Sequence, residues 1–422
     1  MKDSGVKWIG KIPNFWNLYK IGSLFKCRNE KVNDTDYPPL SVSKGGIVPQ
    51  MENVAKSDAN DNRKLVLKND FVINSRSDRK QSCGLSALDG SVSLINTVLY
   101  SENDDIILPE YTNIVMKNYG FAEEFYRWGH GIVADLWTTR WQEMKNILLP
   151  VPSVEFQRKI IEFIEKKLQQ ADDLIAIEQA QIEKLKEYKQ AVITEAVTKG
   201  LNPDMPMKDS GVEWIGKIPN NWEIRRTKFA ADSFSKGSGI TKEDIVVDGD
   251  TPCIRYGEIY TKYNICFENC ITRTNLEKVA SPQYISCGDI LFVCTGELVE
   301  EIGKNIVYLG TEQCLAGGDI IIMKHHQNPL FLSFALNSYV SQCQKSCSKA
   351  KLKVVHISAT DIGNVFIAIP TLEEQSQIAD YLKEKCCKIE RLISIKQEKI
   401  EKLQEYKKSL IYEYVTGKKE VI

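Results

Sequence analysis

The feature that most constrains this chain is an internal duplication. Residues 1–16, MKDSGVKWIGKIPNFW, return as residues 207–222, MKDSGVEWIGKIPNNW, and fourteen of the sixteen positions are identical. A second pair of similar stretches begins at Pro152 and at Pro370. A long internal repeat means that one structural plan is built twice. The predicted plan is a variable segment followed by a helical segment, at residues 1–151 and 152–199, and again at residues 207–369 and 370–417.

The two helical segments carry an apolar stripe with heptad spacing. From Ile164 to Val192, and again from Leu382 to Leu410, the stripe advances in alternating steps of four and three residues, as on one face of a long α-helix. Such a stripe must be buried, and two of these helices in one chain most simply pack against each other. The short linker 200–206 and the compactness expected of a variable segment predict an antiparallel pair, with one variable segment at each end.

A charged residue interrupts the stripe near the middle of each helix. Glu178 lies midway between Ile164 and Val192, and Lys396 is its counterpart in the second copy. A pseudo-twofold antiparallel pair brings these two residues face to face, so we predict an ion pair that sets the register of the helices. The alternative is two solvated charges at a widened seam.

The variable segments show the pattern of short strands mixed with short helices. Strands are predicted at residues 70–73, 92–99, 289–293 and 319–323, and helices near residues 119–128 and 329–338. The predicted fold class is therefore α+β. It consists of two mixed α/β domains separated by an antiparallel coiled coil of long helices, with pseudo-twofold symmetry.

Motifs of catalysis and metal binding are missing. The chain has no G-x-G-x-x-G, G-x-x-x-x-G-K-[ST], H-E-x-x-H or G-x-S-x-G pattern. Its twelve cysteines and four histidines lack the spacing of a structural zinc site, so buried free thiols are expected. No apolar run reaches the roughly 18 to 20 residues that span a bilayer, and residues 1–16 lack the apolar core of a signal peptide, which predicts a cytoplasmic protein without membrane contact.

The charge balance restricts how this chain can bind nucleic acid. Lys and Arg number 55 and Asp and Glu number 56, which excludes a polybasic binder. Any contact with DNA must then use local basic patches or charge from partner proteins. Arginine, lysine and glutamine are the residues that read base edges or hold phosphates.

Local basic and polar clusters in both variable segments are the candidate DNA contacts. A solvated loop is the alternative for any one cluster, but each half of the chain has one. The candidates in the first half follow a predicted strand and are Arg76, Arg79, Lys80, Gln81 and Ser82. Those in the second half are Arg255, Tyr256, Thr295, Lys304 and the lysine run Lys345, Lys349, Lys351 and Lys353.

The repeated motifs resemble those of one protein family. G-V-x-W-I-G-x-I-P-x-x-W occurs at residues 5–16 and 211–222, and E-E-Q-x-x-I opens the second helical segment at residues 373–378. The motifs follow one another in this order over essentially the whole chain. In this respect the chain resembles the specificity subunits of Type I restriction-modification systems. The first helix departs from the pattern with Glu155-Phe156-Gln157 in place of E-E-Q.

The resemblance implies a non-catalytic reader of double-stranded DNA. Each target-recognition domain would read one half of a bipartite site, and the paired helices would set the gap between the halves. Two modification subunits would dock on the helices and bring S-adenosylmethionine for adenine N6-methylation. Restriction subunits, where present, would use ATP and Mg²⁺, and this chain itself would bind no cofactor.

Two other classes of protein remain open. One is a fused restriction and methylation enzyme, against which the missing motifs argue. The other is a helical protein–protein scaffold that does not read DNA.

Overall fold

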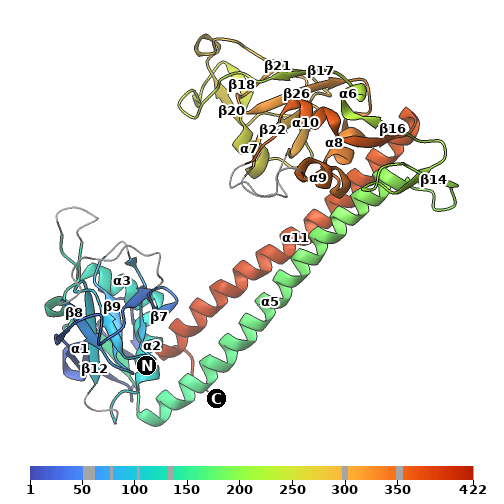
Figure 1. The fold of residues 1–422 in the computed structure, drawn as a ribbon. Coiled ribbons are helices and arrows are strands. Elements are labelled where there is room, and N and C mark those ends of the chain that lie inside the picture. Colours follow the sequence, from blue (N-terminus) through green and yellow to red (C-terminus); the bar gives the residue numbers. More distant parts are fainter. Residues whose placement is uncertain are drawn as a thin grey trace. The chain divides into compact units, whose positions relative to one another are not determined.

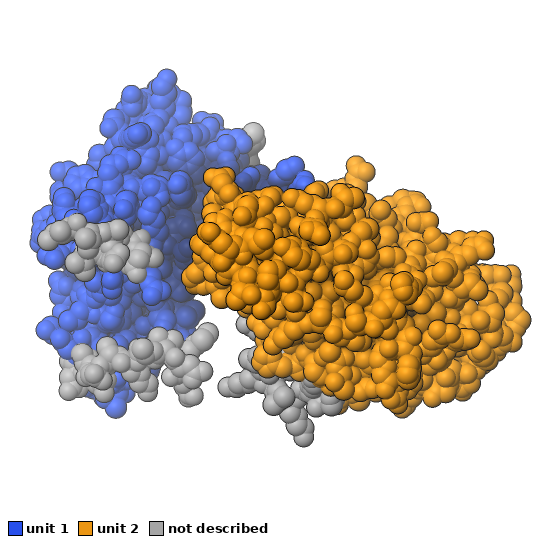
Figure 2. Space-filling model, turned by 90° about the horizontal axis from the view of Figure 1, so that it is seen from above, with its two compact units in different colours: residues 1–179, 397–422 blue, residues 180–396 orange. Residues whose placement is uncertain are grey.

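The computed structural model describes residues 1–50, 62–76, 79–101, 105–131, 137–296, 303–347 and 355–421. The chain forms two compact units, coloured separately in Figure 2. Unit 1 comprises Met1–Gln179 and Gln397–Ile422, and unit 2 comprises Ala180–Lys396. Each unit therefore contains one variable segment and parts of both long helices, α5 (Val154–Lys199) and α11 (Leu372–Val415).

The globular part of unit 1 is built on a four-stranded antiparallel sheet in the order β10-β9-β12-β4. Its inner strands are rich in buried apolar residues, which hold the sheet in the core. The strands of a three-stranded sheet, β11-β8-β5, and of the hairpin β6-β7 lie between its strands along the chain. The strands of these sheets are β4 (Phe25–Cys27), β5 (Lys31–Val32), β6 (Leu40–Ser43), β7 (Gly46–Pro49), β8 (Arg63–Val66), β9 (Phe71–Asn74), β10 (Cys83–Leu85), β11 (Gly90–Val92) and β12 (Asn96–Ser101).

Unit 1 also has two nine-residue helices and several short elements near its ends (Figure 1). Strand β3 pairs with β13, so the start and the end of the first variable segment meet in one ribbon before α5 begins. These elements are β1 (Lys2–Asp3), β2 (Lys11–Ile12), β3 (Asn17–Lys20), α1 (Ile21–Leu24), α2 (Pro109–Lys117), α3 (Tyr119–Arg127), α4 (Trp141–Met144) and β13 (Leu148–Val151).

Unit 2 follows the same plan with a larger sheet. Its five strands run in the order β17-β26-β22-β24-β19, antiparallel except for the last pair. A second sheet, β20-β18-β25-β21, contains one parallel pair, β18 with β25. The strands of these sheets are β17 (Ala231–Lys236), β18 (Thr251–Ile254), β19 (Cys266–Phe267), β20 (Thr272–Thr274), β21 (Tyr284–Ile285), β22 (Ile290–Val293), β24 (Asn305–Tyr308), β25 (Cys314–Ala316) and β26 (Ile320–His325).

The other elements of unit 2 include a ribbon that again joins the two ends of the variable segment. Here β16 pairs with β28 just before α11 begins. The remaining elements are β14 (Met207–Asp209), β15 (Lys217–Pro219), β16 (Glu223–Arg226), α6 (Thr227–Ala230), α7 (Tyr256–Thr261), the 3-10 helix η3 (Leu276–Lys278), β23 (Thr295–Gly296), α8 (Pro329–Asn337), α9 (Tyr339–Ser346), β27 (Val355–His356), α10 (Ala359–Asn364) and β28 (Phe366–Ile369).

The duplicated motif of residues 1–16 and 207–222 anchors the ends of the long helices. In unit 1, Trp8 and Trp16 belong to one buried cluster with Val415 at the end of α11. In unit 2, Trp222 belongs to a cluster with Val197 near the end of α5. The near-identity of the two motifs therefore has a structural reason, because each of them packs against the end of a similar helix.

A buried glutamine fixes the start of each long helix. Gln157 donates from Nε2 to the carbonyl oxygens of Ile106 and Pro152, and its Oε1 accepts from the backbone of Leu108. Gln375 in α11 makes the corresponding bond to Pro370, and its Oε1 accepts from the backbone of Asn328. The glutamine of the E-E-Q motif is therefore structural, because it satisfies backbone groups that would otherwise be buried without partners.

The helices pair antiparallel in both units, as predicted. In unit 1, Lys399 and Lys407 of α11 pair with Glu178 and Asp172 of α5. The residue numbers fall along one helix as they rise along the other. In unit 2, Lys396 donates to Gln181 and Lys189 pairs with Glu390, in the same sense. The α+β class and the antiparallel helix pair are confirmed.

Most predicted elements of the variable segments lie close to observed ones. The strand predicted at 70–73 corresponds to β9, and those at 289–293 and 319–323 correspond to β22 and β26. The predicted helices correspond to α3 and α8. The predicted strand 92–99 is displaced, because residues 93–95 connect β11 to β12. The predicted domain boundaries stay a prediction. Among the described residues, no helix is both long and apolar enough to cross a membrane.

Candidate nucleic-acid interface

The basic cluster of unit 1 lies in a tight turn after β9. The backbone N–H of Arg76 donates to Asn74 Oδ1 at 3.0 Å, and that of Arg79 donates to the carbonyl oxygen of Arg76 at 3.2 Å. Gln81 has a positive φ of 63°, a strained conformation for a residue with a side chain. Arg76, Arg79 and Lys80 are exposed, whereas Ser82 is buried. The turn therefore places three cations at the surface, whereas the side chain of Ser82 lies beneath it.

Two aromatic residues stand beside these cations. The Lys80 ammonium lies 4.2 Å from the centre of the Tyr126 ring and 3.0 Å from Glu123 Oε1. The Tyr126 and Trp137 rings lie 5.8 Å apart, and Trp137 Nε1 donates to the carbonyl oxygen of Tyr126. Cations interleaved with aromatic rings suit contact with nucleic acid. The sequence analysis missed Tyr126 and Trp137, which lie far from the turn along the chain.

In unit 2, Arg255 and Tyr256 line a groove of about 700 Å³. Strand β18 ends just before Arg255, and the six-residue helix α7 begins at Tyr256. Tyr256 is 45% exposed. Other residues lining the groove include Thr241, Lys242, Thr261, Lys262 and Gly317. The groove thus combines three cations with an exposed aromatic ring.

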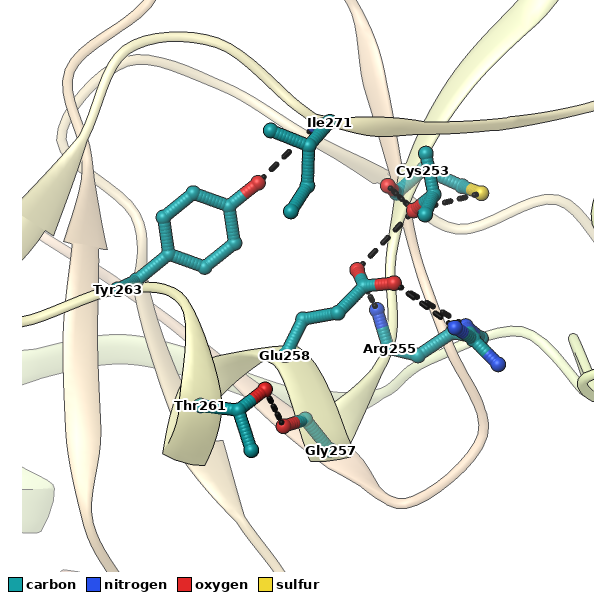
Figure 3. Close-up of polar contacts among 8 residues, drawn as sticks. Cys253, Arg255, Gly257, Glu258, Thr261, Tyr263 and Ile271 are labelled. Carbon is teal, nitrogen blue, oxygen red and sulfur yellow. Dashed lines mark hydrogen bonds and ion pairs between the residues drawn. The ribbon is translucent and has the colours of Figure 1, made fainter. Parts of the chain in front are cut away.

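Glu258 holds Arg255 in place within this groove (Figure 3). Glu258 Oε1 accepts from Arg255 Nη2 at 2.9 Å and from Nε at 3.3 Å, and its Oε2 accepts from the Arg255 backbone N–H at 3.1 Å. Thr272 Oγ1 lies 3.0 Å from the same Oε2. The Glu258 side chain is only 7% exposed. A buried carboxylate with this many donors is a rigid support for the guanidinium.

Helix α7 also connects the predicted residues Thr295 and Lys304. The Tyr260 hydroxyl donates to the carbonyl oxygen of Thr295 at 2.8 Å. The Lys304 ammonium lies 3.5 Å from the carbonyl oxygen of Tyr260 and 5.5 Å from the centre of its ring. Thr295 Oγ1 is also 3.2 Å from His356 Nδ1, across the pair β23-β27. Four predicted residues, Arg255, Tyr256, Thr295 and Lys304, are therefore linked through one helix.

Lys345 does not belong to a surface cluster, contrary to the sequence-based expectation. Its side chain is buried in α9, and its ammonium donates to the carbonyl oxygens of Leu336 at 2.8 Å and Gly303 at 2.9 Å. Burial away from water lowers the pKa of Lys345 to about 7. A contact of Lys345 with DNA stays a prediction. The other three predicted lysines, Lys349, Lys351 and Lys353, lie outside the described residues.

The two charged residues of the helix stripe both lie at the seam between the helices. Glu178 is 5% exposed and accepts from Lys399 of α11 within unit 1. Lys396 donates to Gln181 Oε1 within unit 2. A direct pair of Glu178 with Lys396 would join the two units and stays a prediction. The sequence analysis did not identify Lys399 as a partner of Glu178.

One pair of cysteines departs from the expectation that all of them are free thiols. Cys270 and Cys314 form a disulfide in unit 2, and the other ten are free, with Cys83, Cys253 and Cys386 buried. The spacing of cysteines in the sequence did not reveal this pair, because its two members lie 44 positions apart and meet only in the folded chain. Within the described part of the chain, no group of three or more His, Cys, Asp or Glu side chains is placed to hold a metal ion.

Comparisons with known proteins agree on one family. The family described as "Type I restriction modification DNA specificity domain" matches residues 219–405. The MjaVIII specificity subunit of a Type I restriction enzyme from Methanocaldococcus jannaschii is 25% identical over 295 residues, which make up 65% of this chain and 62% of that protein. The match therefore spans less than two thirds of that relative.

Two solved structures share the fold. A chain from a study of complex assembly and conformational transition in a type I R-M system superposes with a TM-score of 0.69 at 16% identity, covering 96% of this chain and 98% of that one. The HsdS subunit from Thermoanaerobacter tengcongensis gives a TM-score of 0.52, also at 16% identity, over 99% of this chain and 100% of that one.

Proposed function

Since the chain belongs to the family of Type I restriction-modification specificity subunits, we propose that it is the DNA-reading subunit of such a complex. It reads a bipartite site in double-stranded DNA, with one half-site for each variable segment. It contributes no catalytic residue. Adenine N6-methylation and, where restriction subunits are present, cleavage belong to its partners.

The observation that carries this proposal is the presence of a separate basic and aromatic cluster in each unit. Unit 1 presents Lys80 beside Tyr126, and unit 2 presents Arg255 beside Tyr256. The two clusters are built on different elements, a turn after β9 and the end of β18. Different side chains on a repeated scaffold are what two unlike half-sites require, because the pattern of hydrogen-bonding groups in the major groove differs for every base pair.

Partner subunits have a candidate docking surface on the long helices. Leu174 and Ile177 of α5 are exposed in unit 1, and Leu392 and Ile395 occupy the corresponding positions of α11 in unit 2. Paired exposed aliphatic residues on an otherwise charged helix indicate contact with another protein. We assign these two patches to two modification subunits, which would bring S-adenosylmethionine. Restriction subunits would bring the sites for ATP and Mg²⁺.

The docking surface gives a direct prediction. Ile177→Asp should weaken binding of a modification subunit by roughly tenfold to a hundredfold, because burying an isoleucine side chain contributes about 1.5–3 kcal/mol. Gln179→Asp is the matched control, since that exposed residue lies on another side of α5. Titration of purified chain with modification subunit measures both affinities. Equal affinities for the two variants would remove this patch from the interface.

The unit 1 cluster gives a second prediction. Arg76→Ala and Arg79→Ala should alter the first half-site and leave the second unchanged, because their side chains belong to unit 1 alone. A lost base contact costs about 1–3 kcal/mol of discrimination, enough to relax one position of the motif. Sequencing of methylated adenines in cells that carry each variant reads both half-sites at once. Motifs identical to the wild type in both variants would exclude these arginines as readers.

A gel-shift experiment tests the function as a whole. The chain is mixed with labelled genomic fragments, methylated or unmethylated, with and without modification subunits. We expect a sequence-dependent shift with the chain and modification subunits together, and none with modification subunits alone. A complex that assembles but binds every fragment equally would favour the protein–protein scaffold.

A further inference from the structure

Arg255 is held by one edge of its guanidinium group. The hydrogen bonds of its side chain to Glu258 use Nε and Nη2, and both reach the same carboxylate oxygen, Oε1. Among the described residues, no hydrogen bond of Arg255 uses Nη1. A guanidinium has five N–H donors in a planar fork. The support therefore leaves the terminal edge, formed by Nη1 and the second N–H of Nη2, for a ligand in the groove.

The support itself is rigid. Glu258 lies one turn from Arg255 at the start of α7, so the pair is local and its geometry is set by the backbone. Both oxygens of the carboxylate are engaged, because Oε2 accepts from the Arg255 backbone and from Thr272. Thr272 belongs to β20, which pairs with β18, so the carboxylate is also fixed from the neighbouring strand. Arg255 therefore loses little side-chain freedom when it binds.

The groove leaves room beside Arg255. A Cβ at Gly317 would lie 3.1 Å from the carbonyl oxygen of Ile254, which is a tight contact, and 3.6 Å from Arg255 Cγ, which is an ordinary one, so this glycine lets the chain pass close to the end of β18. At Gly239 and Gly257 an added Cβ would meet nothing within 4 Å, which shows open space at these lining positions. Lys242 and Lys262 are exposed at the same groove.

These features favour a base over a phosphate as the ligand of Arg255. A phosphate is attracted mainly by positive charge, which the exposed lysines of the groove also supply, and the negative charge of Glu258 reduces the net attraction of Arg255 for it. A guanine needs two parallel N–H donors in a fixed plane, for its O6 and N7 acceptors. The supported terminal edge of Arg255 offers that arrangement, and the exposed lysines can hold the backbone.

We propose that Arg255 reads a guanine in the major groove of the second half-site, and that Glu258 is the positioning residue that presents its guanidinium. This inference rests on the proposed function and deepens it. It predicts a G·C pair in the half-site that unit 2 reads. It also predicts that the side chain at position 258 affects specificity without touching DNA.

Variants in the assembled complex with modification subunits test the inference. Arg255→Lys should lower discrimination at the guanine position tenfold or more, because a flexible ammonium lacks the two parallel, coplanar N–H donors that the supported guanidinium presents to O6 and N7. Glu258→Gln should act at the same position with a smaller, several-fold effect. The control Lys262→Ala should leave the motif unchanged and weaken binding evenly across sequences, with a lower salt dependence. The methylated motif and the salt dependence of binding are measured for each variant.

A footprint on the wild-type complex keeps the test independent of variant folding. Dimethyl sulfate modifies guanine N7, so the guanine that Arg255 reads should be protected in the second half-site. The inference is overturned if that half-site has no G·C pair, if no guanine in it is protected, or if Arg255→Lys keeps the motif and only lowers salt dependence. A wild-type chain that yields no bipartite motif would instead refute the proposed function itself.

Discussion

Inserting four residues into both long helices should lengthen the nonspecific gap of the proposed bipartite DNA site and leave its two half-sites unchanged. Four residues add about 6 Å to an α-helix. That corresponds to at most about two base pairs, at roughly 3.4 Å for each. The expected effect is large because every genomic site of the original spacing loses methylation and a new set gains it. The reason is that α5 and α11 each belong to both units, so the insertion lengthens the two helices through which the chain passes from one unit to the other.

The best insertion points are the boundaries of the units, after Gln179 in α5 and before Gln397 in α11. A second variant with seven residues in each helix keeps the heptad phase and should lengthen the gap further. Insertion into α5 alone is the matched control. It shifts the ion pairs of one half of the seam, and we expect loss of methylation rather than a longer gap. Methylated motifs with the original gap in both doubly inserted variants would refute a role of the helices in setting the spacing.

Replacing Lys345 by methionine removes a pH dependence from the stability of unit 2. The pKa of this buried lysine is lowered from its ordinary 10.5 to about 7. Between these values the unfolded chain binds a proton that the folded chain does not, so stability increases as the pH rises. The penalty for burying the ammonium is full below pH 7 and is relieved as the pH climbs toward 10.5. From pH 7 to 8.5 this relief amounts to about 2 kcal/mol.

Hydrogen exchange of peptides from α9 measures this effect within unit 2. The free energy of opening in the wild type should rise relative to Lys345→Met by about 2 kcal/mol between pH 7 and 8.5. Comparing the two proteins cancels the contributions of other groups, such as the buried cysteines. Lys324→Met, at an exposed lysine of the same unit, should follow the wild type. An equal pH dependence in wild type and Lys345→Met would mean that the lysine keeps its proton when folded.

The duplicated parts of the fold could be predicted from the sequence because their signals are local. The heptad stripe that begins at Ile164 and at Leu382 identifies two long helices, and the short linker 200–206 makes their antiparallel pairing the simplest arrangement. The two tryptophan motifs marked equivalent positions without revealing what they pack against. Their role at the helix ends became clear only from the contacts of Trp8 with α11 residues and of Trp222 with α5 residues.

The candidate site could be predicted only in part, because its partners come from distant positions. Arg76 and Lys80 were recognisable as cations after a strand, but nothing near them in sequence indicates Tyr126 or Trp137. Lys345 belongs to a run of lysines, which indicated an exposed position. In the structure its ammonium is buried and donates to a carbonyl oxygen of α8. For Glu258 a signal was present: it follows Arg255 by three residues, a spacing that brings two side chains together at the start of a helix.

The most direct test of bipartite reading is the set of methylated adenines in a genome that carries this chain and its modification subunits as the only such system. We expect a single motif of two short, specific half-sites separated by a gap of fixed length and no sequence preference. Exchanging residues 1–151 for those of a related chain should then replace one half-site and keep the other. A continuous motif, or a change of both half-sites on that exchange, would contradict the reading of one half-site by each unit.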